Sequence, residues 1–152
     1  MNEAMDKPLH SDPQAVADAV GAGMMAEDAA SRGLGMQIEA MAPGYAKLRM
    51  PVREDMLNGF KICHGGFITT LADSAFAFAC NSSNALTLAA GIAVEFIAPA
   101  RLGDMLTAEA QEMSMTGRTG IYDVIVTNQR GETVVLLRGR SHRTRDRKTV
   151  PL

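Results

Sequence analysis

An aspartate and a nearby histidine–glycine–glycine step are the parts of this sequence best suited to chemistry. Asp73 lies within Leu71–Cys80, a run that is apolar apart from Asp73 and Ser74. Burying an unpaired carboxylate costs on the order of several kcal/mol and raises its pKa. A raised pKa is what a carboxylate base needs in order to work near neutral pH. We therefore predict that Asp73 acts in catalysis; the alternative is that it hydrogen-bonds to Ser74, Thr69 or Thr70 and fixes a subunit contact.

The second feature, His64-Gly65-Gly66, stands where a loop enters the apolar run. Amide N–H groups at the start of a helix have no partner within the helix, and the helix dipole makes them partly positive. Two glycines let a ligand oxygen approach the backbone closely. This step can therefore hold an oxyanion. The simpler alternative is a tight turn before the helix.

Other chemistry is less favoured. Asn58 stands in a Leu-Asn-Gly triplet, which is typical of a turn. Cys63 beside His64 suggests a Cys–His nucleophile, but sequence neighbours usually point apart, and a lone cysteine is more often a small buried hydrophobe. The histidines His10, His64 and His142 and the two cysteines lack the spacing of metal ligands. Because a Gly-x-Ser-x-Gly elbow, a P-loop and a Rossmann fingerprint are also missing, we predict no metal and no cofactor.

A basic segment runs from Arg138 to Lys148. One interpretation is the solvated end of a strand followed by a tail. The other is contact with phosphate groups, which suit the forked guanidinium of arginine, and Arg143 and Arg145 are the candidates for it.

The elements that must position these residues can be read from hydrophobic periodicity and turn residues. We expect an α+β fold, in which a twisted antiparallel sheet wraps around one central buried helix and an N-terminal helix covers it. The domain itself spans 35–143, after a leader and N-terminal helix (1–34) and before a flexible C-terminal tail (144–152). Ser11 or Asp12 is expected to cap the first helix. The expected elements are a helix over Pro13–Ser31, strands over Met36–Ala42 and Tyr45–Met50, a helix over Phe67–Ser82, and strands over Ala89–Ile97, Met105–Thr116, Gly120–Asn128 and Thr133–His142.

Composition bounds the class of protein. The chain has 152 residues, 47% of them hydrophobic, as expected for a single globular domain. A formal net charge of -2 does not favour nucleic acid or an anionic membrane as a partner. The N-terminus lacks a signal peptide pattern, and no apolar run approaches the ~20 residues of a membrane span. Two cysteines do not make a disulfide framework, so we predict a cytoplasmic protein.

With these residues in hand, the chain resembles the phenylacetate-degradation (hydroxyphenylacetyl-CoA) thioesterases of the hotdog superfamily. The resemblance spans roughly Gly35 to Arg143 and is most specific between Asn58 and Ser82. The matching stretches are Met56-Leu-Asn-Gly59, Cys63-His-Gly-Gly66, Leu71-Ala-Asp-Ser-Ala-Phe-Ala-Phe-Ala-Cys-Asn-Ser82, Val94-Glu-Phe-Ile97, Gly120-Ile-Tyr-Asp-Val124 and Arg138-Gly-Arg-Ser-His-Arg143.

The resemblance implies an acyl-CoA thioesterase that forms a tetramer, a dimer of hotdog dimers, with active sites between subunits. It implies that Asp73 is the general base or nucleophile, and that the Gly65 amide of the other subunit polarises the thioester carbonyl. Asn58 and His64 match residues that position water or thioester, and Ser74 occupies the polar position after the aspartate. The expected substrates are aryl (hydroxyphenylacetyl-type) or medium-chain acyl-CoA.

Two other functions remain as alternatives. One is a non-catalytic acyl-CoA sensor, which would be expected to lose the buried carboxylate or to carry a DNA-binding helix pair. The other is an acyl-thioester dehydratase or hydratase, which commonly uses histidine to abstract an α-proton.

Overall fold

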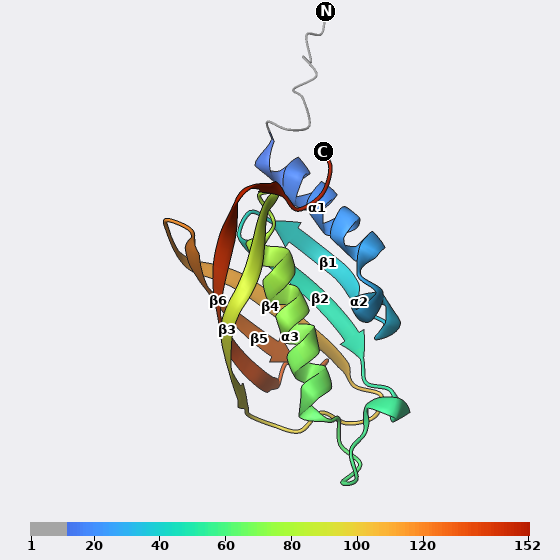
Figure 1. Ribbon diagram of the computed structural model, residues 1–152. Helices are drawn as coiled ribbons and strands as arrows, with labels where there is room; N and C mark the ends of the chain where they lie inside the picture. The colour runs from blue at the N-terminus through green and yellow to red at the C-terminus, as the bar shows by residue number, and fades with distance from the viewer. Residues whose placement is uncertain (1–11) are drawn as a thin grey trace, which may run out of the picture.

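The protein is a six-stranded antiparallel sheet curled around one helix, as a computed structural model of residues 12–152 shows (Figure 1). The strand order is β1-β2-β4-β5-β6-β3, and each neighbouring pair runs antiparallel. The predicted sheet around a central helix is confirmed. The leader residues, with His10 and Ser11, lie outside the described residues. The elements are α1 (Pro13–Glu27), α2 (Ala29–Gly33), β1 (Gln37–Ala42), β2 (Tyr45–Pro51), the short 3-10 helix η2 (Glu54–Met56), α3 (Gly65–Cys80), β3 (Ala85–Phe96), β4 (Met105–Thr116), β5 (Thr119–Thr127) and β6 (Thr133–Lys148).

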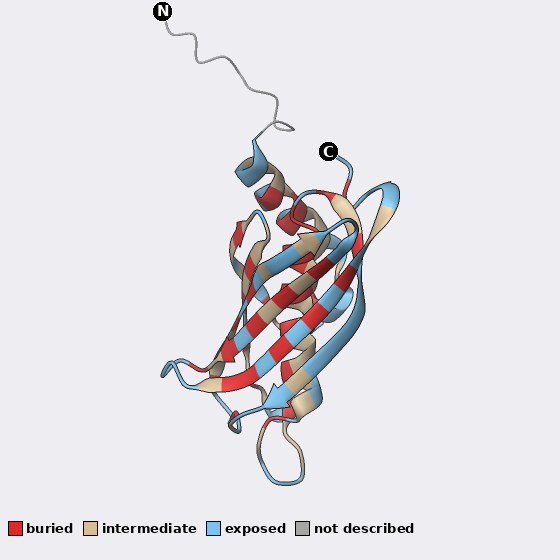
Figure 2. Cartoon of the chain, turned by 90° about the vertical axis from the view of Figure 1, so that its left-hand side faces the viewer, coloured by how far each residue is buried: buried red, intermediate tan, exposed pale blue. Residues whose placement is uncertain are grey.

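Alternating burial along the strands builds the concave face of the sheet. Successive residues of a strand point to opposite faces, so one apolar residue in two can face the helix. Leu48 of β2 is opposite Ala108 of β4, Ala108 is opposite Val126 of β5, and Val126 is opposite Val135 of β6. All four side chains are fully buried. Figure 2 shows the same alternation as bands of buried and exposed residues along the central strands of the sheet.

The helix α3 lies in this concave face and is buried on one side only. Leu71, Ala75 and Phe78 are fully buried against the sheet. In a single chain, the predicted central buried helix is therefore buried on this side and not on the opposite one. Thr69, Asp73 and their neighbours on the opposite face are only half-buried, because one sheet cannot surround a helix.

The packing of α3 is close enough to fix the residue type on the strand beneath it. Phe76 stacks at an angle against Tyr122, with ring centroids 5.4 Å apart. Tyr122 is opposite Gly139 in the β5–β6 ladder. A Cβ atom at Gly139 would lie only 2.7 Å from the Phe76 ring, so a side chain at this position would displace the aromatic core.

The N-terminal helix covers the outer part of the sheet beside β1, as Figure 1 shows. Asp12 caps α1, accepting a hydrogen bond from the Gln14 amide at 3.1 Å, so the prediction of Asp12 as the cap is confirmed. The predicted single helix to Ser31 is interrupted at Asp28. The Asp28 carboxylate accepts the Ser31 amide at 2.9 Å, which ends α1 and caps the new helix α2.

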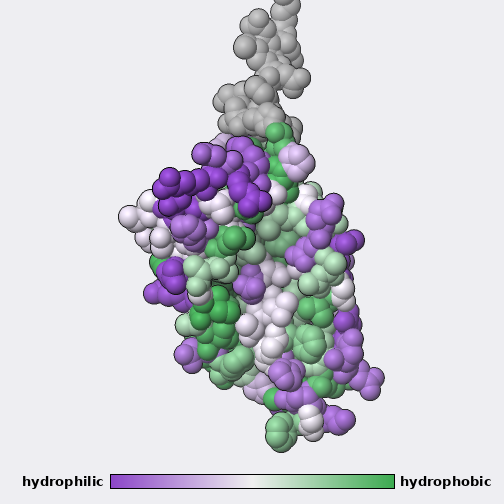
Figure 3. Space-filling model, in the orientation of Figure 1, coloured by the Kyte–Doolittle hydropathy of each residue, from purple (hydrophilic) through white to green (hydrophobic). Residues whose placement is uncertain are grey.

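β3 is the exposed edge of the sheet. Within residues 12–152 it pairs with β6 alone, and most of its residues are exposed. Its large apolar side chains Leu88, Ile92 and Phe96 are all exposed. Figure 3 shows apolar side chains over β3, on the face of the molecule that also carries α3. An apolar edge strand with a free row of backbone groups is a template for pairing with another chain.

The prediction of a flexible tail from residue 144 needs correction. β6 continues to Lys148, and Ala85 at the start of β3 pairs with that residue. Two buried asparagines then bind the chain: Asn84 exchanges two hydrogen bonds with the Val150 backbone, and Asn81 accepts from the Thr149 hydroxyl at 2.7 Å. The charge pattern gave no sign of this, because the bonds that hold the segment come from the end of α3.

Candidate active site

The first turn of α3 leaves one amide N–H free. His64 is the N-cap residue, and its Nδ1 accepts the Gly66 amide at 3.1 Å. The Gly65 amide has no acceptor among the described residues. Because Nδ1 accepts, the neutral His64 ring carries its proton on Nε2. The helix start therefore presents two donors to a ligand, the Gly65 N–H and the His64 Nε2–H, and the helix dipole strengthens the first.

An open pocket of about 530 Å³ lies against this turn, and Gly65 forms part of its wall. Its lining has no charged side chain and only one side-chain amide, that of Asn58. Such a surface suits an uncharged, largely apolar group. The lining residues are Asn58, Ile62, Cys63, Gly65, Ile68, Phe96, Ile97, Ala98 and Pro99.

Gly65 is in close contact with Phe96. A Cβ atom at Gly65 would lie 2.6 Å from the Phe96 ring, so a side chain at this position would have to displace the ring. The ring therefore lies directly on the backbone that carries the free amide. Phe96 is 59% exposed and also lines the pocket.

Asn58 closes the loop that forms the other wall of the pocket. Its Oδ1 accepts the Phe60 amide at 2.9 Å, and its own amide donates to the Ile62 carbonyl at 2.8 Å. The turn interpretation of Asn58 is therefore correct. Its Nδ2 group has no partner in the part of the chain that the structure describes, so it is available to a ligand in the pocket.

Asp73 lies two turns further along α3, on the half-buried face. Burial raises the pKa of its carboxyl above the ordinary value. The local partners considered above are engaged elsewhere: Thr69 and Thr70 each donate to the carbonyl four residues earlier at 2.9 Å, and Ser74 bonds to Ser31. The local structural role for Asp73 is therefore unsupported.

One chain does not bring Asp73 and Gly65 together. They are eight residues apart on the same helix, and a rise of about 1.5 Å per residue separates them by roughly 12 Å. A thioester carbonyl cannot contact both. Asn58 shares the pocket with Gly65, whereas Asp73 and Ser74 form a second group on the exposed side of α3.

The two candidate phosphate ligands differ in their surroundings. Arg143 is half-buried near the C-terminal end of α3, where its Nη2 donates weakly to Ser83 at 3.5 Å. A guanidinium there also suits the negative end of the helix dipole. Arg145 is exposed.

Neither cysteine is a nucleophile in this structure. Both thiols are free and buried. Burial raises the pKa of Cys63 to about 11 and that of Cys80 to about 12, so both remain protonated at neutral pH. This agrees with the expectation that Cys63 is a small buried hydrophobe and not the nucleophile of a Cys–His pair.

Phe96 and Ser31 are the residues of interest that sequence reasoning missed. Phe96 stands in the Val94-Glu-Phe-Ile97 stretch that carried the family resemblance, and an apolar residue close before a proline was the available signal. Ser31 carried no signal, because its contact with Ser74 joins residues 43 positions apart.

With the geometry in place, the class of protein follows from comparison with known families. The thioesterase superfamily model matches residues 60–135, which include the free amide, every pocket-lining residue except Asn58, and Asp73. The chain belongs to the thioesterase superfamily, and the predicted hotdog fold is confirmed.

The particular relatives agree. The acyl-coenzyme A thioesterase PaaI of Escherichia coli is 44% identical over 120 residues, covering 79% of this chain and 86% of that protein. The structure of the E. coli PaaI protein from the phenylacetic acid degradation operon superposes with a TM-score of 0.86, at 41% identity over 88% of this chain and 96% of its own. A hypothetical thioesterase protein of Streptococcus pneumoniae with coenzyme A superposes with a TM-score of 0.71, at 25% identity over 74% of this chain and 91% of its own. The resemblance to the phenylacetate-degradation thioesterases is confirmed.

Two further findings concern residues 12–152 as a whole. No group of three or more His, Cys, Asp or Glu side chains in this range could hold a metal ion. No helix in this range is long and apolar enough to cross a membrane.

The raised pKa of Asp73 predicts how stability depends on pH. A carboxyl with a higher pKa in the folded state destabilises the fold once it ionises, starting above the ordinary aspartate pKa of about 3.9. Asp73→Asn should therefore raise the free energy of unfolding at pH 8, and the gain should shrink as pH falls toward 4. Urea unfolding at fixed protein concentration measures both values. Equal gains at every pH, or a loss at pH 8, would show that the carboxylate has a stabilising partner.

Proposed function

We propose that the protein is an acyl-CoA thioesterase that hydrolyses aryl or medium-chain acyl-CoA to the free acid and CoA, without a metal or cofactor. One observation carries the proposal: a free helix-start amide at an apolar pocket, on the helix that holds a half-buried carboxyl with a raised pKa. The 44% identity to an acyl-coenzyme A thioesterase supports the same reaction here.

The groups fit a general-base hydrolysis. The Gly65 N–H donates to the thioester oxygen, which becomes an oxyanion as the water oxygen bonds to the carbonyl carbon. Asp73 takes a proton from that water. The carbon–sulfur bond then breaks, and the departing sulfur takes the proton from Asp73, so CoA leaves as the free thiol. The apolar pocket receives the acyl group, and Asn58 Nδ2 in its lining holds the thioester. His64 Nε2–H is a further donor at the start of α3, outside the lining of that pocket.

We propose that each site is shared between two chains. The roughly 12 Å between Asp73 and Gly65 on one helix prevents a single chain from completing the site. The half-buried face of α3 and the exposed edge strand β3 lie on the same side of the molecule, so a symmetric partner could cover both (Figures 1 and 3). Asp73 of one chain would then meet Gly65 of the other.

A second interface would make the tetramer. Met113, Ile125 and Leu136 are exposed apolar side chains on the strands β4, β5 and β6. Apolar side chains that the fold leaves exposed in this way are typical of an interaction surface. A dimer of dimers that packs through these strands would remove the three side chains from water.

We propose that Arg145 contacts the CoA phosphates, together with Arg143. Arg145 is exposed, whereas Arg143 is half-buried at the end of α3, where its buried Nε has no hydrogen-bond partner among the described residues. The free thiols Cys63 and Cys80 suit a reducing compartment, and we propose the cytoplasm.

The direct test is release of free CoA from a panel of aryl and medium-chain acyl-CoA substrates, followed with a thiol reagent. Activity should persist after chelation of metals. Asp73→Asn should lower kcat by about 10²–10⁴-fold, as expected for loss of a positioned base, with the fold and ligand binding intact. Substrate binding by the wild-type protein without thiol release would instead identify a sensor, and water loss without thiol release would identify a dehydratase.

Mixing variants tests whether the site is shared. Chains with Asp73→Asn and chains with Gly65→Ala are each expected to lose most activity, the second because its Cβ, 2.6 Å from the Phe96 ring, must displace this pocket-lining side chain. In a heterodimer, one site combines both lesions and the other has neither. Random reassembly of an equal mixture should therefore recover about a quarter of wild-type sites by dimer symmetry. Confirmed subunit exchange without recovered activity would place both residues of a site on one chain.

Arg145→Ala should raise KM for acyl-CoA several-fold, leave kcat nearly unchanged and weaken the dependence of KM on salt. Steady-state kinetics at two ionic strengths provide the measurement. Arg49→Ala removes an exposed arginine from β2 and serves as the matched control. If both variants change KM equally, Arg145 has no specific phosphate contact.

A further inference from the structure

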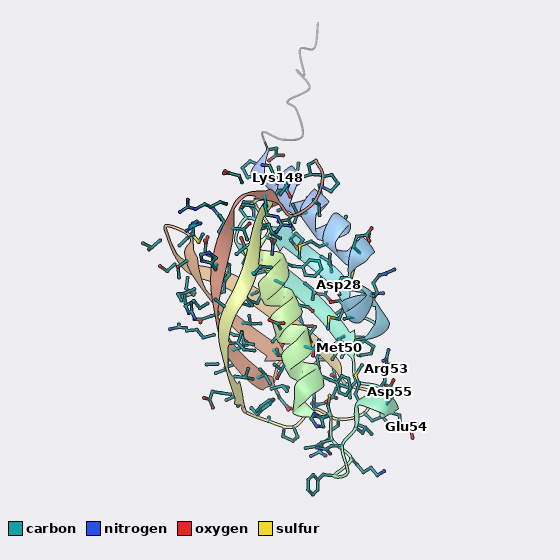
Figure 4. The ribbon with its side chains drawn as sticks, in the orientation of Figure 1. Asp28, Met50, Arg53, Glu54, Asp55 and Lys148 are labelled. Carbon is teal, nitrogen blue, oxygen red and sulfur yellow. The ribbon has the colours of Figure 1, made fainter. Side chains whose placement is uncertain are left out.

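The short helix α2 is joined to the catalytic helix by a chain of three polar side chains. The hydroxyls of Ser31 on α2 and Ser74 on α3 are 2.9 Å apart. Asp28 binds Ser31 twice: its Oδ2 is 2.6 Å from the Ser31 hydroxyl, and its Oδ1 accepts the Ser31 amide at 2.9 Å. Ser31 is 1% exposed, so its hydroxyl depends on these partners. Figure 4 labels Asp28 at the junction of α1 and α2, beside α3 in this view.

Donor and acceptor chemistry fixes the direction of this chain. An ionised carboxylate only accepts hydrogen bonds, so the Ser31 hydroxyl must give its single proton to Asp28. The Ser31 oxygen can then only accept from Ser74, whose own proton is therefore committed to Ser31. Both lone pairs of the Ser74 hydroxyl are left for other donors, and Ser74, itself half-buried, directly follows Asp73 on α3.

We propose that Asp28 and Ser31 are positioning residues, which hold the Ser74 hydroxyl as an obligate acceptor for the attacking water; this inference rests on the proposed thioesterase activity. The water has two protons. Asp73 accepts the one that is transferred, and Ser74 accepts the other. A lone pair of the water oxygen is then directed at the carbonyl carbon. A Ser74 hydroxyl free to turn would instead donate to the water and occupy that lone pair.

A contact that only joined α2 to α3 would not need a carboxylate-oriented pair of hydroxyls. The other hydroxyls on the exposed side of α3, those of Thr69 and Thr70, bind backbone carbonyls of their own helix. Of these three hydroxyls, Ser74 is the one bound to a hydroxyl on another helix, that of Ser31 on α2, which the Asp28 carboxylate orients. An apolar pair would join α2 to α3 without burying two hydroxyls, because burial of polar groups is unfavourable unless they are satisfied.

Asp28→Asn reverses the donor–acceptor direction of the hydrogen bonds from residue 28 to Ser74, with little change in side-chain shape. The asparagine oxygen can still accept the Ser31 amide, so α2 keeps its cap. Its NH₂ group now donates to the Ser31 hydroxyl, which turns its proton toward Ser74, and Ser74 turns its proton into the site. We expect kcat to fall about tenfold, with KM and the thermal midpoint nearly unchanged. Asp12→Asn is the matched control, because it changes the cap of α1 in the same way, far from Ser74 along the chain.

Further variants separate orientation from anchoring. Ser31→Ala removes the hydroxyl that links Asp28 to Ser74 and should lower kcat to a similar extent. It provides a second measure if Asp28→Asn folds poorly. Ser74→Thr keeps the hydroxyl and should stay near wild-type activity. In a Ser74→Ala background, Asp28→Asn should have no further effect on kcat.

Two results would overturn the inference alone: an active wild-type enzyme in which Asp28→Asn matches Asp12→Asn, or an Asp28→Asn effect that persists without Ser74. A wild-type protein that releases no CoA would overturn the proposed function, and this inference with it.

Discussion

The partial enclosure of α3 is the constraint on which the rest of the structure depends. The concave sheet buries Leu71, Ala75 and Phe78 and leaves the opposite side of the helix uncovered. That uncovered side holds Asp73 in an environment dry enough to raise its pKa, yet open enough for a substrate to reach it. A helix fully enclosed by its own chain could not offer a base, and a fully solvated helix would not shift its pKa.

In the proposed mechanism, α3 supplies both the oxyanion donor and the base, from positions two turns apart along the helix. His64 caps the Gly66 amide, which leaves the Gly65 amide unpaired at the positive end of the dipole. Asp73 stands two turns away, beyond the reach of one carbonyl group. A rigid helix cannot bend to bring these two groups together. Two copies of the helix, related by symmetry, can place the Gly65 amide of one chain beside Asp73 of the other.

Much of this could be predicted from the sequence because the relevant signals are local. The alternation of apolar and polar residues predicted the strands from Met105 onward. The apolar run with its single carboxylate predicted α3 and singled out Asp73. The rest depends on contacts between distant segments. The segment after residue 143 is held by Asn81 and Asn84, and the Gly65 backbone lies under Phe96. Ser31 meets Ser74 only because Asp28 ends one helix and begins another. None of these contacts has a period or a spacing that a linear pattern could reveal.

The sheet order also bears on how the chain acquires its structure during synthesis. β3 has β6 as its partner within the described chain, and residues 97–132 must be made before β6 begins. At about 5–20 residues per second, the ribosome completes β3 roughly two to seven seconds before it adds the first residue of β6. Until β6 is present, the apolar residues Leu88, Ile92 and Phe96 belong to a strand without its partner from the same chain. A ribosome pause between β5 and β6 would lengthen the time for which β3 lacks that partner.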